Sequence, residues 1–134
     1  MHDVIKLLEE NPVQYFATIG LDGKPKVRPF QFMHEEDSKL YFCTSNQKEV
    51  FKEMSKSPYI ELSVSTTDYK WIRLKGKVVF SDDMKIKKAI VEKSEIVKMV
   101  YKTAENPDFE IFYLEDAKAI LADFSGNEPR EVRL

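Results

Sequence analysis

Hydrophobic and polar residues alternate along much of this chain, and the alternation predicts a protein built mainly from β-strands. The clearest stretch is Tyr59–Ser65. Its apolar residues Ile60, Leu62 and Val64 share one face and its polar residues the other, which is the pattern of a half-buried strand. The stretch Lys70–Ser81 alternates in the same way over a longer distance.

Shorter apolar runs predict the remaining strands, at Val13–Gly20, Pro25–His34, Lys39–Cys43 and, as one or two strands, within Ile111–Phe124. Asp22-Gly23 between the first two of these is a strong hairpin signal. Six or so strands joined mainly by hairpins do not fit the strand–helix alternation of a parallel sheet. The expected fold is therefore mainly β: a six-stranded antiparallel Greek-key barrel, closed or nearly closed, with helices at its ends.

Helices are expected where apolar residues recur at intervals of three and four. There are three such stretches: residues 1–10, Gln47–Lys56, and a segment from Asp82 or Asp83 to about Tyr101. Asn46 and Glu49 have the spacing of a capping box at the start of the second helix. The third is expected to bury one stripe, formed by Ile86, Ile90, Val97 and Val100.

Composition indicates a single globular domain. The chain has 134 residues, of which 43% are hydrophobic and 33% charged, and we expect one domain over residues 1–134. No apolar run approaches the roughly 20 residues that span a bilayer. The N-terminus also lacks the apolar block of a signal peptide. The sequence therefore predicts a cytoplasmic protein with no membrane partner.

The net charge and the few cysteines and histidines argue against a nucleic-acid-binding protein and a metalloprotein. The 21 basic and 23 acidic residues give a net charge of −2, which offers no electrostatic reason to expect nucleic-acid binding. Cys43 is the single cysteine, so no internal disulfide is possible, and no histidine adjoins it to activate it as a nucleophile. The two histidines, His2 and His34, lie far apart in sequence, so no metal site is expected.

The end of the strand before Gln47 carries the first candidate site. Thr44, Ser45 and Asn46 end this strand, and Lys48 falls in the first turn of the predicted helix. A cation there opposes the helix dipole, whose N-terminal end is already positive. Hydroxyls, free backbone N–H groups and a lysine at one point form a seat for a phosphate. The alternative is ordinary helix capping, with Lys48 in solvent.

A second candidate site lies along the strand that contains Arg28, Pro29, Phe30 and Gln31. Pro29 has no N–H to donate, so we expect this strand to be irregular or at a sheet edge there. A planar ligand could lie along that edge, with Gln31 and unpaired backbone groups at its polar rim. If this strand neighbours Thr44, the side chains of Arg28 and Lys48 could both bind one phosphomonoester, which is a dianion. Alternatively, Arg28 is a surface charge and Pro29 protects the edge.

Trp71 and Arg73 share the outward face of the long strand. A tryptophan there indicates that another subunit or a flat ligand covers it, although an isolated exposed aromatic is the simpler alternative. The sequence contains no Ser-His-Asp set, no carboxylate pair with an acid–base role and no glycine-rich phosphate loop, so no catalytic residue is assigned. If the protein is an enzyme, the reactive group is expected to be a cofactor.

Three segments together resemble a known family: YFATIGLDGKPKVRPF, LYFCTSNQKEVF and WIRLKGKVVFSDD. In order and spacing, over residues 4–124, they are similar to the FMN-binding split-barrel proteins related to pyridoxamine 5′-phosphate oxidase. The small bacterial members grouped with nitroimidazole-resistance and general-stress flavoproteins are the nearest in pattern. The resemblance implies a homodimer with two FMN molecules at the subunit interface.

The resemblance also implies roles for individual residues. Arg28 would reach the flavin or its phosphate, and Pro29, Phe30 and Gln31 would line the flavin ring. Thr44, Ser45, Asn46 and Lys48 would hold the phosphate. Trp71 and Arg73 would approach the same flavin, from the partner subunit. Gln47-Lys48 stands where related oxidases have consecutive basic residues, and residues 127–134 contain no tryptophan, so oxidation of vitamin B6 is not implied.

The sequence thus leads to two functional hypotheses. The first is an FMN-dependent oxidoreductase of undefined substrate, with a small molecule or NAD(P)H as reaction partner. The second is a non-catalytic protein on the same barrel that stores or senses flavin or haem.

Overall fold

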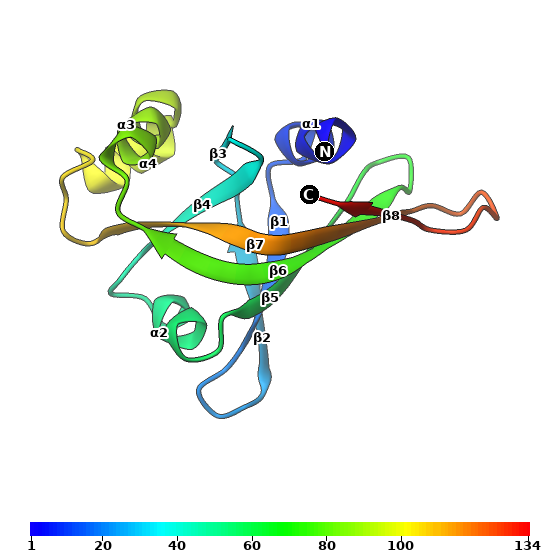
Figure 1. Ribbon diagram of the computed structural model, residues 1–134, viewed down its shortest axis with the longest axis horizontal. Helices are drawn as coiled ribbons and strands as arrows, with labels where there is room; N and C mark the ends of the chain where they lie inside the picture. The colour runs from blue at the N-terminus through cyan, green and yellow to red at the C-terminus, as the bar shows by residue number, and fades with distance from the viewer.

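The computed structural model describes all 134 residues, which form eight strands and four helices (Figure 1). In chain order these are α1 (His2–Glu10), β1 (Gln14–Ile19), β2 (Pro25–Phe30), β3 (His34–Glu36), β4 (Lys39–Ser45), α2 (Glu49–Lys56), β5 (Tyr59–Ser65), β6 (Trp71–Ser81), α3 (Met84–Lys93), α4 (Glu95–Tyr101), β7 (Phe109–Ala122) and β8 (Arg130–Arg133). None of the four helices is long and apolar enough to cross a membrane.

All strands belong to one antiparallel sheet in the order β2-β1-β5-β6-β7-β4-β3, and β8 pairs with β7 beyond the part of β7 that pairs with β4. Figure 1 shows the two longest strands, β6 and β7, running across the molecule, with α3 and α4 near one end. The predicted mainly-β antiparallel split barrel is confirmed. Because β2 and β3 are the two ends of the path, hydrogen bonding does not close the barrel.

The strand count differs from six because β3 and β8 were not predicted as separate strands. The expected strand Pro25–His34 ends at Phe30, and β3 begins at His34. Between them, the N–H of Phe32 donates to the buried amide oxygen of Gln14 at 2.6 Å, so a side chain replaces the strand ladder. The same side chain donates to the carbonyls of Leu8 and Asn11, at 3.0 and 2.7 Å. Strand β8 lies in a segment too polar to show an apolar alternation.

The helices also depart from the sequence prediction. The single helix expected up to Tyr101 is broken at Ser94, which ends α3 and caps α4 by accepting a hydrogen bond from the N–H of Val97. The break changes the helical face, so Val97 is buried but Val100 is exposed, contrary to the prediction. At α2, Lys48 is the N-cap residue rather than part of the first turn.

Two hydrophobic clusters hold these elements. The larger fills the barrel and includes residues of α1 and α2. It contains an aromatic group in which Phe42 and Phe112 stack with ring centroids 5.7 Å apart, and Phe16 meets both edge-on. The smaller lies between α3, α4 and the other face of β4 and β7. Strand β4 therefore has buried residues on both faces, which fixes the position of the turn that follows it.

Candidate functional site

The turn between β4 and α2 is tight and leaves the start of the helix uncapped by a side chain. The N–H of Lys48 donates to the carbonyl of Ser45 at 3.1 Å, and the N–H of Gln47 donates to the Ser45 hydroxyl at 3.1 Å. No side chain accepts a hydrogen bond from the first turn of α2. The first N–H groups of the helix therefore remain available to an anion.

Asn46 does not cap α2, contrary to the capping-box prediction. Its amide donates to the carbonyl of Pro107 and to the Glu110 carboxylate, both at 2.8 Å. Asn46 thus ties the turn to the start of β7, which leaves Lys48 and the backbone as the groups at the helix end.

A concave surface of about 790 Å³ lies between the β1–β2 hairpin and the start of α2. It brings together Arg28 and Lys48, as the sequence predicted, but by a different route. Strands β2 and β4 are not neighbours in the sheet; instead α2 lies against β1 and meets the hairpin there. We call this surface the hairpin pocket. Its lining residues are Leu21, Asp22, Pro25, Lys26, Val27, Arg28, Lys48, Glu49, Val50 and Glu53.

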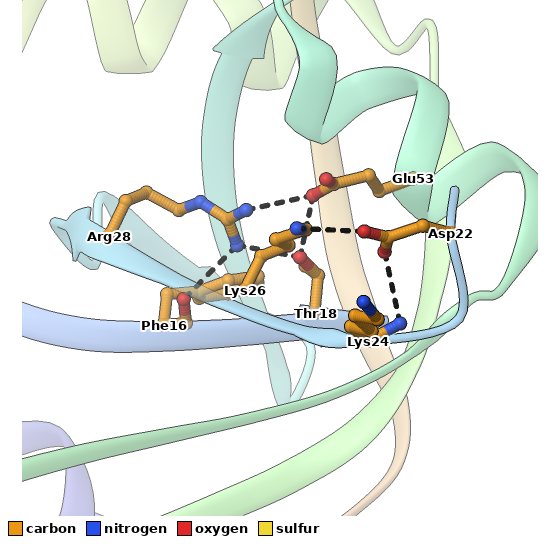
Figure 2. A network of polar contacts seen from close by, with 7 residues as sticks. All are labelled: Phe16, Thr18, Asp22, Lys24, Lys26, Arg28 and Glu53. Carbon is orange, nitrogen blue, oxygen red and sulfur yellow. Dashed lines mark hydrogen bonds and ion pairs between the residues drawn. The ribbon is translucent and has the colours of Figure 1, made fainter. Parts of the chain in front are cut away.

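Arg28 is held in a polar network at the side of this pocket (Figure 2). Its Nη2 donates to Glu53 Oε1 at 2.7 Å, and its Nη1 donates to Thr18 Oγ1 at 2.7 Å and to the carbonyl of Phe16 at 3.2 Å. The Thr18 hydroxyl also donates to Glu53 Oε1, at 2.7 Å. The network joins β2, β1 and α2, so Arg28 is neither a free surface charge nor an unpaired cation.

Glu53 is the functional candidate that sequence reasoning missed. Its side chain is only 3% exposed, in contrast to 24% for Arg28. One signal was present in the sequence: Glu53 lies three residues after Val50 and next to Met54, on the apolar face of α2. A carboxylate on a buried helical face needs a partner, and Arg28 provides it.

The charges of the hairpin pocket cancel. Its three basic side chains (Lys26, Arg28, Lys48) face three acidic ones (Asp22, Glu49, Glu53). Lys26 Nζ lies 3.2 Å from Asp22 Oδ2. Hydrogen bonds from the N–H of Lys24 and from Lys26 hold the pKa of Asp22 below its usual value. With Arg28 paired as well, Lys48 is the basic residue of the pocket that forms no ion pair.

Thr44 and Ser45 differ in environment. Ser45 is half-buried, and its hydroxyl accepts the turn hydrogen bond from Gln47. Thr44 is buried, and its Oγ1 is the one buried side-chain polar atom of the chain without a hydrogen-bond partner. A buried hydroxyl without a partner costs free energy. Thr44 lies on the same face of β4 as Leu40 and Phe42, toward the barrel interior, and neither Thr44 nor Ser45 lines the hairpin pocket.

Strand β2 is at a sheet edge, as Pro29 predicted. Pro29 is exposed on β2, and Gln31 is exposed just after its last residue; neither lines the hairpin pocket. Phe30 points the other way and stacks on Phe16, with ring centroids 4.4 Å apart. Phe30 therefore supports the strand from the barrel interior, while its two neighbours remain accessible.

Trp71 and Arg73 lie on the outward face of β6, opposite the fully buried Ile72 and Leu74. They do not line the hairpin pocket. Arg73 pairs with Glu61, its Nη2 lying 2.8 Å from Oε1. Trp71 is half-buried against Phe124, with ring centroids 5.0 Å apart. Trp71 is therefore not an isolated exposed aromatic, because the same chain covers part of it.

Cys43 lies before the turn and is not activated. Burial raises the pKa of its thiol to about 12, and the nearby charge of Lys48 offsets only part of this effect. Cys43 is therefore a packing residue at neutral pH rather than a nucleophile.

Comparisons with known proteins agree with this fold. A crystal structure of a NimC/NimA family protein from Clostridium acetobutylicum is 30% identical, with a TM-score of 0.91 over 100% of this chain and 92% of that one. General Stress Protein 26 from Bacillus anthracis str. Sterne is 18% identical, with a TM-score of 0.78 over 99% and 97% of the two chains.

A pyridoxamine 5′-phosphate oxidase-related, FMN-binding protein from Nostoc punctiforme is 13% identical, with a TM-score of 0.69 over 98% of this chain and 95% of that one. A search of curated proteins found no match. The sequence pattern described as pyridoxamine 5′-phosphate oxidase matches residues 2–120. This match covers most of the chain, and the chain therefore belongs to the pyridoxamine 5′-phosphate oxidase family.

Proposed function

We propose that this protein binds FMN and acts as an oxidoreductase on a small molecule. The observation that carries the proposal is the hairpin pocket, where the uncapped start of α2, Lys48 and Arg28 converge. This arrangement offers backbone N–H groups and an unpaired ammonium to one anion, which suits a phosphomonoester. Family membership and the FMN-binding relative from Nostoc punctiforme support flavin as the bearer of that phosphate.

Different residues would bind the phosphate and the ring of the cofactor. Lys48, the N–H groups of α2 and the Ser45 hydroxyl of the adjoining turn would hold the phosphate. Arg28 would direct its remaining N–H groups at the same end of the ligand. Pro29, exposed on the edge strand β2, and Gln31, exposed just after it, would line the ring. FMN, when bound, supplies the redox chemistry, and the protein supplies binding and orientation.

We further propose that the active form is a homodimer. The face of β1, β2 and β5 that points away from the barrel interior carries the apolar side chains of Tyr15, Val27 and Tyr59, which are between 57% and 66% exposed. Tyr15 pairs with Pro29 across the ladder and Ala17 with Val27, so these side chains form one surface. A second copy would cover it. Trp71 and Arg73 of that copy would then approach the flavin.

The absorption spectrum of the purified protein, read before and after adding NADH, tests the function. We expect a flavin spectrum, or uptake of added FMN, and bleaching by the reductant. Lys48→Ala should weaken FMN binding about 10- to 100-fold, as loss of a charged hydrogen bond does. The control Lys52→Ala, on the same helix but outside the pocket, should leave binding unchanged. A colourless protein that takes up no FMN would refute the proposal.

The second candidate is a non-catalytic binding protein for flavin or haem. The hairpin pocket favours it in one respect: its carboxylates are balanced by basic residues, and Cys43 nearby is protonated at neutral pH, so no side chain there is poised to react. Bound flavin that neither NADH nor NADPH reduces, under air or without oxygen, supports this role. A haem spectrum in the purified protein supports the haem-binding form.

A further inference from the structure

We propose that Glu53 sets the charge that the hairpin pocket offers to the cofactor phosphate, and so determines how strongly the protein prefers FMN over flavin without phosphate. Glu53 does so by cancelling the charge of Arg28 while holding its guanidinium in place. The inference rests on the phosphate site proposed above. It assigns to Glu53 the role of a positioning residue that also limits affinity.

The geometry favours a role for Glu53 beyond packing. One oxygen of its carboxylate, Oε1, receives both the Arg28 and the Thr18 hydrogen bond at 2.7 Å. Burying an ion pair costs desolvation free energy, and apolar residues of similar volume often serve stability as well or better. A charged pair at this position, lining a candidate anion site, therefore affects what the site binds.

The other charged groups of the hairpin pocket do not replace Glu53 as the partner of Arg28. Asp22 and Lys26, on the hairpin, pair with each other at 3.2 Å. Lys48 and Glu49, at the start of α2, line the same pocket. With Arg28 neutralised by Glu53, the phosphate would meet Lys48, the N–H groups of α2 and hydrogen bonds from Arg28, but not a second net positive charge.

Removing the charge of Glu53 while keeping its shape should therefore strengthen FMN binding. In Glu53→Gln the side-chain oxygen can still accept the hydrogen bonds of Arg28 and Thr18, but the guanidinium becomes an uncompensated cation. An uncompensated unit charge beside a phosphate in a solvated pocket changes affinity on the order of tenfold. Riboflavin, which lacks the phosphate, should bind wild type and variant equally.

The pH dependence has a defined sign. A phosphate monoester loses its second proton near pH 6, so FMN carries more negative charge at pH 8 than at pH 5. The gain in Glu53→Gln should therefore be larger at pH 8 than at pH 5. A purely structural role for Glu53 would weaken both flavins together and produce no such difference.

The experiment titrates wild type, Glu53→Gln and the control Glu92→Gln, freed of cofactor, with FMN and with riboflavin. Glu92 is exposed on α3 and does not line the pocket, so its variant should change the FMN-to-riboflavin ratio less than about threefold. A ratio for Glu53→Gln equal to or below that of wild type would overturn the inference alone. Wild type that binds neither flavin would overturn the proposed function and the inference together.

Wild type alone provides a second measurement if Glu53→Gln does not fold. A pocket whose charges cancel should lose less than about threefold in FMN affinity between 50 mM and 500 mM salt, because screening acts on net fields. A loss of tenfold or more would show that Arg28 and Lys48 act as two uncompensated cations, which contradicts the inference.

Discussion

Replacing Arg28 with methionine would remove the partner of a carboxylate that is only 3% exposed. The substitution deletes three hydrogen bonds, to Glu53, Thr18 and Phe16, and leaves the negative charge of Glu53 at the end of the barrel. Breaking a fully buried pair in this way costs about 3–5 kcal/mol. The Arg28 side chain is 24% exposed, so water screens part of the loss, and we expect about 2–3 kcal/mol.

The loss should appear as a lower free energy of unfolding in urea, with the slope against denaturant unchanged. In thermal unfolding it corresponds to a fall in Tm of about 6–10 °C for a chain of this size. Circular dichroism measures both. Adding Glu53→Leu to Arg28→Met should recover part of the loss, because the uncompensated carboxylate is then gone.

Arg73→Met is the matched control. Arg73 also pairs with a glutamate, Glu61, at 2.8 Å, but the two side chains are 54% and 38% exposed. Exposed pairs of this kind contribute about 0–1 kcal/mol. Equal losses in Arg28→Met and Arg73→Met would refute the reasoning, because they would mean that burial of the Glu53 carboxylate has no energetic consequence.

Two further predictions concern the thiol and the outward sheet face. Because burial raises the pKa of Cys43 to about 12, its thiolate is scarce at pH 8, and a thiol reagent should label the folded protein at least 100-fold more slowly than the unfolded one. Labelling of the folded protein as fast as in urea would contradict this expectation. Between pH 9 and pH 12 the unfolded chain releases the thiol proton before the folded protein does, so the contribution of Cys43 to the free energy of unfolding should decline as pH rises. Val27→Glu should turn a dimer into a monomer in sedimentation or light scattering, whereas Lys24→Glu in the adjoining turn should not. A wild-type protein that is a monomer at all concentrations would refute the proposed interface.

Local patterns allowed much of the sheet to be predicted from sequence. Strand β5 follows a strict alternation and β6 alternates up to Val78, and Asp22-Gly23 marks the β1–β2 hairpin, where Gly23 has a positive φ of 78°. Strand β8 could not be found in this way. Its four residues are mostly exposed, and it forms because β7 offers an unpaired edge.

The candidate site was only partly predictable, for a similar reason. The residues of the β4–α2 turn are contiguous, so sequence alone could identify Ser45 and Lys48 together. The pairing of Arg28 with Glu53 joins positions 25 residues apart through Thr18, on a third element. No local pattern encodes that contact. The helix break at Ser94 depends likewise on one side chain that caps α4, which periodicity does not detect.

The buried amide of Gln14 has a consequence for the dynamics of the barrel. It connects the end of α1, through Leu8 and Asn11, to the N–H of Phe32 between β2 and β3. Helix α1 and the residues between β2 and β3 are therefore coupled, since both are held by the same side chain. If α1 detaches and frees the Gln14 side chain, the amide proton of Phe32 should exchange faster with solvent deuterium. The deuterium-exchange rate of the Phe32 amide is thus a probe of how firmly the N-terminal helix is docked.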